Sequence, residues 1–176
     1  KWAPDILITN TSMLSIMLMR KAEEQIFADT KKWLAAEDLP EKEREEAKKD
    51  RIFHIVVDEL HLYRGTAGSE IACLLRMLYH AIGLEPVVDN GYGHKIPNPQ
   101  IKIIASSASL GDNTQKFLEE FFGIYSTIES EEVFNIQNGS KIRFFIRFGL
   151  VPLRTAIVME WEIYMEYMRN WIILNP

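Results

Sequence analysis

Short runs of apolar residues alternate with longer amphipathic stretches along the first two thirds of the chain. Three of these runs, at residues 4–9, 53–57 and 101–105, are rich in isoleucine, leucine and valine. Apolar runs of this length that contain β-branched residues are typical of buried strands. The pattern therefore predicts three strands.

The stretches between these runs have helical spacing. Residues 12–27 are apolar almost all round in their first turns, which predicts a buried helix, and residues 31–36 form a second, short helical piece. Residues 66–82 place apolar side chains at intervals of three and four, and a capping box opens a helix over residues 112–122. Strands and helices in alternation predict an α/β fold, in which helices flank a parallel sheet.

Two other stretches are polar. Residues 37–51 interleave acids and bases, which is typical of a solvated helix; a clamp on nucleic acid is the alternative. Residues 85–100 contain three prolines and an Asn-Gly pair, so we expect a loop there.

The last third of the chain has a weaker pattern. Residues 133–136 and 141–148 can form two strands of a hairpin that turns at Asn138-Gly139. Residues 154–173 are predicted to form an amphipathic helix with one apolar seam. The seam consists of Ile157, Trp161, Tyr164, Met168 and Trp171. We expect it to pack on the core of this chain; the alternative is a surface for self-association or for a partner.

Composition narrows the class of protein. Apolar residues make up 47% of the 176 residues, and no run of 18 uncharged apolar residues occurs, so we expect a globular domain and no membrane partner. No secretory signal is visible. The single cysteine, Cys73, is expected to be buried and reduced, which favours a cytoplasmic protein. The histidines have no zinc-binding spacing, and the lack of an initiator methionine suggests a piece of a longer protein.

Candidate chemistry is concentrated at the end of the second apolar run. Asp58 and Glu59 follow the run directly, and His61 comes two residues later. Open α/β sheets bind their ligands at the carboxyl ends of strands. Phosphoryl-transfer sites need one carboxylate near Mg²⁺ and a second group to orient the attacking water. The plainer interpretation is that the two acids only begin a turn.

Two further motifs support the chemical interpretation. The first run is followed by Thr9-Asn10-x-x-Met13-Leu14, and the third by Ser107-Ala108-Ser109. Together with Asp58-Glu59-Leu60-His61, these motifs resemble the first motor domain of superfamily 2 helicases of the DEAD/DEAH-box class. Two longer segments, residues 58–70 and 108–112, resemble the large DNA helicases grouped with Lhr and the YprA-type repair helicases.

The resemblance implies a fold and a division of the chain. The fold is an incomplete RecA-like, three-layer parallel sheet, a P-loop NTPase fold that lacks its Walker A strand, with a helical C-terminal segment. Residues 1–124 would be the C-terminal part of the motor domain, and residues 125–176 an extension.

The resemblance also implies roles for the acidic motif. Asp58 would hold Mg²⁺, usually through water, and Glu59 would orient and deprotonate the attacking water, so that both contact Mg²⁺-ATP. His61 would couple the nucleotide state to the rest of the motor; otherwise it is a structural histidine.

The two flanking motifs would connect hydrolysis to nucleic acid. Ser107, Ala108 and Ser109 correspond to the Ser-Ala-Thr motif that links ATP hydrolysis to strand movement, with Ser109 where threonine is usual. Thr9 and Asn10 correspond to a strand-binding motif, with Asn10 where many relatives have proline. Small residues after a strand also simply permit a tight turn.

Three functions remain open at this stage. The first is part of an ATP-dependent DNA helicase, inactive alone because the chain has no Gly-x-x-x-x-Gly-Lys-Thr phosphate loop. The second is a motor ATPase of a restriction or phage-defence system that translocates without unwinding, and the third is a non-catalytic interaction module. The net charge of −5 predicts that the chain alone binds nucleic acid weakly.

Overall fold

The computed structural model of the chain describes residues 3–107, 113–128, 133–138, 143–146 and 156–159. The helices are α1 (Thr11–Met19), α2 (Glu24–Leu34), α3 (Glu41–Lys48), the short 3₁₀ helix η1 (Leu60–Leu62), α4 (Thr66–Ala81) and α5 (Thr114–Phe122). The strands are β1 (Ile6–Ile8), β2 (Phe53–Val57), β3 (Val87–Asp89), β4 (Lys95–Pro97), β5 (Ile101–Ser107), β6 (Ile136–Asn138), β7 (Arg143–Ile146) and β8 (Ala156–Met159).

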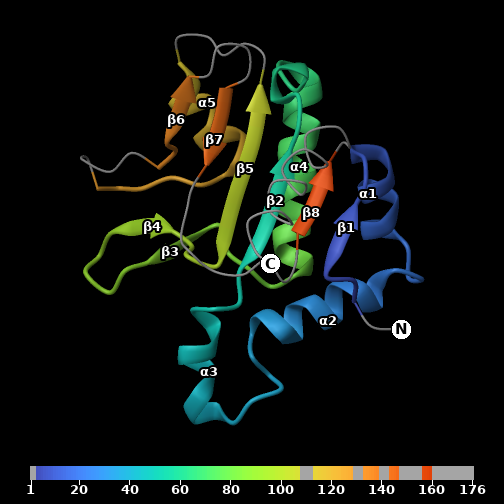
Figure 1. Ribbon diagram of the computed structural model, residues 1–176, viewed down its shortest axis with the longest axis vertical. Coiled ribbons are helices and arrows are strands. Elements are labelled where there is room, and N and C mark those ends of the chain that lie inside the picture. The colour runs from blue at the N-terminus through green and yellow to red at the C-terminus, as the bar shows by residue number, and fades with distance from the viewer. Residues whose placement is uncertain (1–2, 108–112, 129–132, 139–142, 147–155, 160–176) are drawn as a thin grey trace, which may run out of the picture.

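One mixed sheet forms the centre of the fold (Figure 1). Its strands lie in the order β1-β8-β2-β5-β7-β6, and β3 and β4 form a separate antiparallel hairpin. Strands β1, β8, β2 and β5 are parallel, whereas β7 and β6 are antiparallel additions at one edge. The three predicted strands and the α/β class are confirmed, although Ile6 and Ile8 of β1 are exposed and not buried. The sequence did not predict that the C-terminal hairpin would join this sheet as an antiparallel edge.

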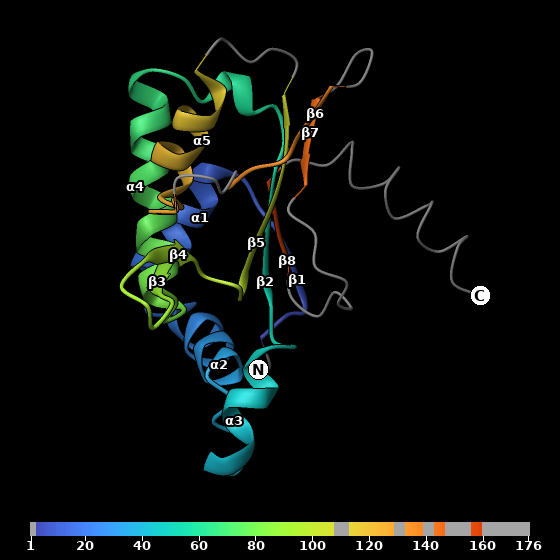
Figure 2. The same ribbon diagram turned by 90° about the vertical axis from the view of Figure 1, so that its left-hand side faces the viewer.

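The helices α1, α4 and α5 all lie on one face of the sheet (Figure 2). The described residues therefore form two layers, a helical layer and the sheet. The third layer and the RecA-like assignment stay predictions, as does the missing Walker A strand. Strands β6, β7 and β8 lie beyond residue 124 in the chain yet join the same sheet, and the predicted division into two segments stays untested.

The core lies between the sheet and α4. Alternate side chains of β2 and β5 enter it, because successive residues of a strand point to opposite faces of a sheet. The apolar positions predicted for residues 66–82 are buried against them, so the amphipathic helix is confirmed. The buried side chains of these three elements include Phe53, Ile55, Val57, Ile101, Ile103, Ile71, Leu74, Leu75 and Leu78.

The predicted helix over residues 12–27 is two helices. Helix α1 ends where Arg20 adopts an extended backbone conformation, and α2 starts at Glu24 and includes most of the predicted piece at 31–36. Helix α1 is also not buried all round, because Met13 and Met19 are exposed. Arg20 begins a short polar stretch, which explains why the chain turns toward solvent here.

The predicted helix over residues 154–173 is wrong at its start. Ala156–Met159 is strand β8, which pairs in parallel with β1 on one side and β2 on the other. The segment forms backbone hydrogen bonds with a strand on each side. Such pairing outweighs the helical spacing of its apolar residues. Ile157 therefore belongs to the sheet, and the other residues of the predicted seam lie outside the described residues.

Other expectations have mixed outcomes. The predicted C-terminal hairpin is confirmed as an antiparallel pair, β6 with β7, but its first strand is Ile136–Asn138 and not 133–136. Asn138, predicted in the turn, pairs with Arg143 within the sheet. The predicted loop over residues 85–100 contains the β3–β4 hairpin, whose antiparallel pairing was missed. Cys73 is exposed and not buried, because it lies on the solvent side of α4. None of the described helices is long and apolar enough to cross a membrane.

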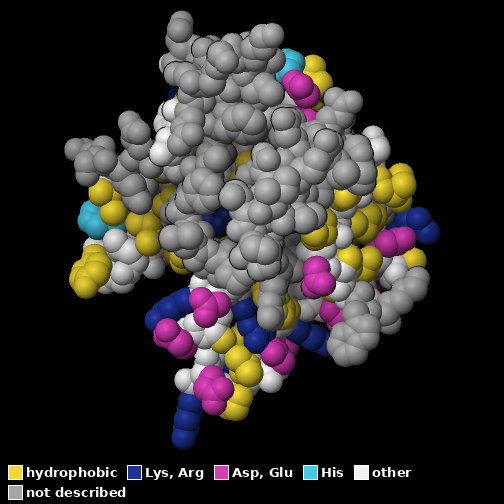
Figure 3. Space-filling view, in the orientation of Figure 1, with side chains coloured by type: hydrophobic (Ala, Val, Ile, Leu, Met, Phe, Trp, Pro, Cys, Tyr) yellow, Lys and Arg dark blue, Asp and Glu magenta, His cyan; other side chains and the backbone are white. Residues whose placement is uncertain are grey.

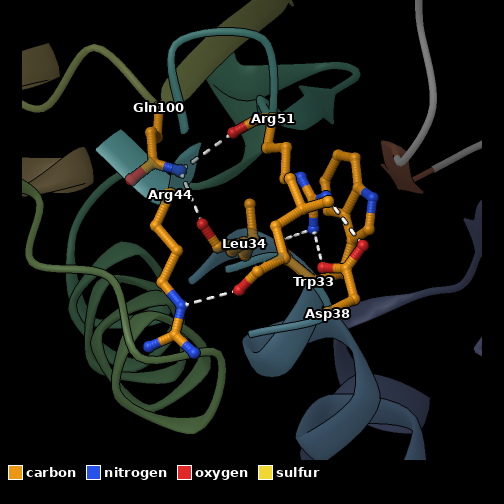
Figure 4. Close-up of polar contacts among 7 residues, drawn as sticks. Trp33, Leu34, Asp38, Arg44, Arg51 and Gln100 are labelled. Atoms are coloured by element: carbon orange, nitrogen blue, oxygen red, sulfur yellow. Dashed lines mark hydrogen bonds and ion pairs between the residues drawn. The ribbon is translucent and has the colours of Figure 1, made fainter. Parts of the chain in front are cut away.

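Helices α2 and α3 extend below the sheet, where Figure 3 shows acidic and basic side chains interleaved on the surface. No residue of α3 is buried, as predicted for a solvated helix. Gln100 ties this helical pair to the sheet: its Nε2 donates hydrogen bonds to the carbonyl oxygens of Leu34 and Arg51, each at 3.0 Å (Figure 4). Arg51 in turn donates to Asp38 and to the Trp33 carbonyl, the latter at 2.7 Å.

Candidate functional site

The parallel pairing of β2 and β5 brings two of the sequence motifs side by side. Val57 is level with Ala105 in this pairing, so the next residues along each strand, Asp58 and Ser106, are neighbours. Both side chains are buried, with 8% of Asp58 and 6% of Ser106 exposed. A carboxylate and a hydroxyl thus meet at the carboxyl edge of the parallel strands, which is where α/β sheets bind ligands.

The two oxygens of the Asp58 carboxylate have different surroundings. Oδ1 accepts a hydrogen bond from the Ser106 hydroxyl and one of 2.9 Å from the Glu59 backbone N–H. Oδ2 has no hydrogen-bond partner among the described residues. Among the described residues, the carboxylate is therefore held through one of its two oxygens.

Glu59 has an unusual backbone conformation. Its φ of 50° and ψ of 43° lie in the left-handed region, which costs an L-residue about 1–2 kcal/mol relative to the right-handed one. The turn that results separates the two adjacent acids, because the Asp58 side chain stays buried whereas 43% of the Glu59 side chain is exposed. Its N–H also approaches the Ser106 hydroxyl oxygen at 3.3 Å, which helps to hold the conformation.

His61 lies beside the second acid. Its Nδ1 is 3.0 Å from Oε2 of Glu59, and 27% of its side chain is exposed. The contact is an ion pair when the imidazole is protonated. In that state the histidine restricts where the Glu59 carboxylate points.

The loop after His61 is fixed to the helical layer by aromatic contacts that the sequence did not indicate. The ring of Tyr63 stacks on Phe121 of α5, with centroids 6.3 Å apart, and the Arg64 guanidinium lies 5.2 Å from the centroid of Phe117. The Tyr63 carbonyl also packs closely against Gly68 of α4, where a Cβ atom would lie 2.0 Å from the carbonyl oxygen. The acidic loop is thereby connected to both helices.

The residues predicted for coupling are only partly described. Ser107 is 1% exposed at the end of β5, and Ala108 and Ser109 lie outside the described residues. Ser106, which was not among the predicted site residues, contacts the acidic motif. The contact could have been predicted from the sequence, because Asp58 and Ser106 are each the first polar residue after an apolar run.

The residues predicted to contact nucleic acid have local structural roles. Asn10 is the N-cap of α1, where its Oδ1 accepts a hydrogen bond of 2.8 Å from the Met13 N–H. Thr9 is 9% exposed, and its hydroxyl donates to the Asn10 carbonyl at 3.2 Å. Both follow β1, so they lie at the same edge of the sheet as Asp58 (Figure 1). Their role toward nucleic acid stays a prediction.

The donor set suits magnesium better than a metal held by protein side chains alone. The described residues contain no group of three or more histidine, cysteine, aspartate or glutamate side chains that could hold a metal. Magnesium usually keeps several waters and binds through one or two carboxylates together with substrate phosphates. Asp58, with one free carboxylate oxygen, fits that kind of site.

A hollow on the surface of α4 is separate from this site. It is lined by Leu18, Arg76, Met77, His80 and Ala81, at the end of α4 that is remote from Asp58. None of the predicted site residues lines it, and it contains no carboxylate. The predicted site residues therefore lie at the strand ends and not in the hollow.

The fold and site define an α/β protein with a pair of acids at the end of a central parallel strand. The chain is similar to the Druantia protein DruE of Escherichia coli (strain UMEA 4076-1), with 35% identity over 140 residues, or 78% of this chain. That match spans only 6% of the length of the relative. No protein-family model and no solved structure matches the chain.

Proposed function

We propose that this chain supplies the magnesium- and water-binding half of the ATPase site of a DNA helicase or translocase. The observation that carries the proposal is the asymmetric environment of Asp58, whose Oδ1 accepts two hydrogen bonds while Oδ2 accepts none from the described residues. The adjacent Glu59 side chain reaches solvent from the same turn. Phosphoryl transfer to water needs one carboxylate near Mg²⁺ and a second group that orients the attacking water.

The residues would divide the chemistry between them. Bound magnesium would neutralise charge on the phosphate oxygens of ATP. Asp58 would orient a water of the metal through Oδ2, and Glu59 would accept a proton from the attacking water. His61 would keep the Glu59 carboxylate in position through its contact of 3.0 Å. The phosphate-binding loop and the second motor domain would come from other parts of a longer protein.

The decisive experiment is Glu59→Gln in the full-length protein. The amide keeps the size of the side chain but cannot accept the proton, so ATP binding should persist while turnover falls by about 100-fold or more. ATP binding is measured by filter retention and turnover by phosphate release. Glu85→Gln is the matched control, because Glu85 is an exposed glutamate far from Asp58 and the change in charge is the same. Normal turnover by Glu59→Gln would refute the proposed function.

The same preparation distinguishes the two kinds of motor. A helicase separates a forked duplex in an ATP-dependent manner, whereas a translocase displaces a third strand from a triplex without separating the duplex. Stimulation of the ATPase by DNA and by RNA of the same sequence tests the preference for DNA. The similarity to DruE is compatible with both kinds of motor.

The role of a non-catalytic interaction module predicts a different result. In that case neither ATP turnover nor its dependence on Glu59 would be found in the full-length protein. The buried hydrogen bonds of Asp58 argue for the catalytic role, because a polar turn on a binding surface has no need of a carboxylate that is 8% exposed.

A further inference from the structure

Ser106 is in a position that the sequence motifs did not single out. It lies within β5, where it pairs with Phe144 of β7 and directly follows Ala105, the last residue that pairs with β2. Its side chain is 6% exposed and faces Asp58, the first residue after β2. The hydroxyl is therefore presented to the acidic turn by a rigid strand and not by a loop.

One hydroxyl makes both contacts. A serine hydroxyl has a single proton to donate and lone pairs to accept with. The Ser106 hydroxyl donates its proton to Oδ1 of Asp58 and approaches the Glu59 N–H at 3.3 Å as an acceptor. The same N–H donates to Oδ1 at 2.9 Å, so the three groups form a closed triangle.

The triangle determines the placement of both acids. Because Oδ1 is occupied twice, the Asp58 carboxylate cannot rotate without breaking hydrogen bonds to a buried charge, which are among the stronger ones in proteins. Oδ2 is thereby aimed away from β5. The left-handed conformation of Glu59 depends on the same N–H, so the hydroxyl also holds the second acid in its exposed position.

We propose that Ser106 is a positioning residue, which fixes the carboxylate oxygen that Asp58 offers to magnesium and holds the turn that places Glu59. The inference rests on the proposed function, because it concerns the same site. Ser106 contacts neither metal nor nucleotide, and it acts through Asp58 and Glu59. Loss of its hydroxyl should leave Oδ1 with the Glu59 N–H as its one remaining donor in the triangle, so the carboxylate is held by one hydrogen bond instead of two.

The test compares variants of Ser106 in the full-length protein. Ser106→Ala removes the hydroxyl, Ser106→Thr keeps it, and Ser106→Cys keeps the size but has only a weak donor. Thr30→Val is the matched control, because Thr30 is a buried hydroxyl on α2 that donates to the Ile26 carbonyl at 2.8 Å. Thermal melting of each variant shows whether stability alone has changed.

Two measurements separate positioning from stability. The first is the Mg²⁺ concentration that gives half-maximal ATP turnover, and the second is Mn²⁺ binding followed by electron paramagnetic resonance in the presence of ADP without turnover. Loss of a hydrogen bond to a charged group should weaken both by about tenfold in Ser106→Ala. Ser106→Thr should restore values near those of the wild type, Ser106→Cys should be intermediate, and Thr30→Val should have wild-type metal dependence.

The outcomes distinguish the inference from the proposed function. If Glu59→Gln abolishes turnover but Ser106→Ala has wild-type metal dependence in both measurements, the inference is wrong and the proposed function stands. If Glu59→Gln turns over normally, the proposed function is wrong, and the inference that rests on it is wrong as well. If Ser106→Ala does not fold, Ser106→Cys decides, because wild-type metal dependence of that variant would also overturn the positioning role. Equal metal defects in Ser106→Ala and Thr30→Val would overturn it too.

Discussion

Individual side chains in this protein show how burial changes the chemistry of a polar group. Tyr79 of α4 is 1% exposed, and its hydroxyl has no hydrogen-bond partner among the described residues. Burial raises the pKa of Tyr79 above its ordinary value, because the ionised phenolate would lose its hydration. An unpaired hydroxyl in the core costs stability, in contrast to Asp58, whose buried oxygen is hydrogen-bonded twice.

Tyr79→Phe should therefore stabilise the fold. Removal of the unpaired hydroxyl should raise the free energy of unfolding by about 1 kcal/mol at neutral pH. The measurement is urea denaturation followed by circular dichroism. Tyr92→Phe is the control, because Tyr92 is 87% exposed and its hydroxyl is in water, so less than about 0.5 kcal/mol should change. A clear loss of stability in Tyr79→Phe would show that the hydroxyl has a partner.

The same residue should affect alkaline stability. Below pH 10 Tyr79 is protonated in both states, whereas above pH 10 the unfolded chain loses the proton and the folded chain keeps it. The unfolded state then binds fewer protons, so the free energy of unfolding falls as the pH rises, by about 1 kcal/mol from this residue by pH 11. Tyr79→Phe should lose stability less steeply between pH 10 and 11 than the wild type.

At the scale of elements, the connection from β2 to α4 depends on close backbone packing. The chain turns at Glu59, continues through η1 and enters α4, where Gly68 lies against the Tyr63 carbonyl. A side chain at position 68 has no room, because its Cβ would be 2.0 Å from the carbonyl oxygen. The ring of the same residue, Tyr63, stacks on Phe121 of α5.

Gly68→Ala should destabilise the domain despite the better helix propensity of alanine. The helix preference alone would stabilise by about 1 kcal/mol, whereas forced displacement of the Tyr63 backbone should cost about 1–3 kcal/mol net. Urea denaturation gives the difference. Gly91→Ala is the comparison, because Gly91 has open space around its Cβ position and a φ of 80°, so only backbone strain is added. Equal small effects at both glycines would contradict the packing argument.

At the scale of the whole molecule, the helical pair α2–α3 and the sheet are joined far from the acidic site. Gln100 precedes β5 and reaches the last residue of α2 and the residue before Ile52 with one amide group (Figure 4). Arg51 adds the ion pair with Asp38, and its guanidinium lies 5.6 Å from the centroid of Trp33. These contacts fix where β2 begins, and therefore where Asp58 lies at its other end.

Gln100→Ala should weaken this junction. Two carbonyl oxygens would lose their donor, which should lower the free energy of unfolding by about 1–3 kcal/mol. Gln25→Ala is the matched control, because Gln25 is exposed and bonds only to Asp29 one turn away, so a change below about 0.5 kcal/mol is expected. Denaturation in urea reports both values. If the two variants lose the same stability, the junction at Gln100 does not hold the helical pair.

The elements that could be predicted from the sequence are those whose residues have one environment along their whole length. Strands β2 and β5 and helix α4 were predicted because burial imposes a regular apolar pattern on them. The position of Asp58 and Glu59 at a strand end followed from the same pattern, since the first polar residues mark where burial stops. The overall α/β class then followed from the alternation of elements.

Features that depend on distant partners could not be predicted from the sequence, because they arise when the chain folds. Ala156–Met159 became strand β8 because β1 and β2 flank it, and Cys73 faces solvent because the sheet lies on the other side of α4. The contact of Ser106 with Asp58 joins residues 48 positions apart, and it exists because two parallel strands pair in one register. The spacing of apolar residues within a segment shows which of its side chains are buried. It does not show which other segment packs or pairs against them, because that depends on residues far away in the chain.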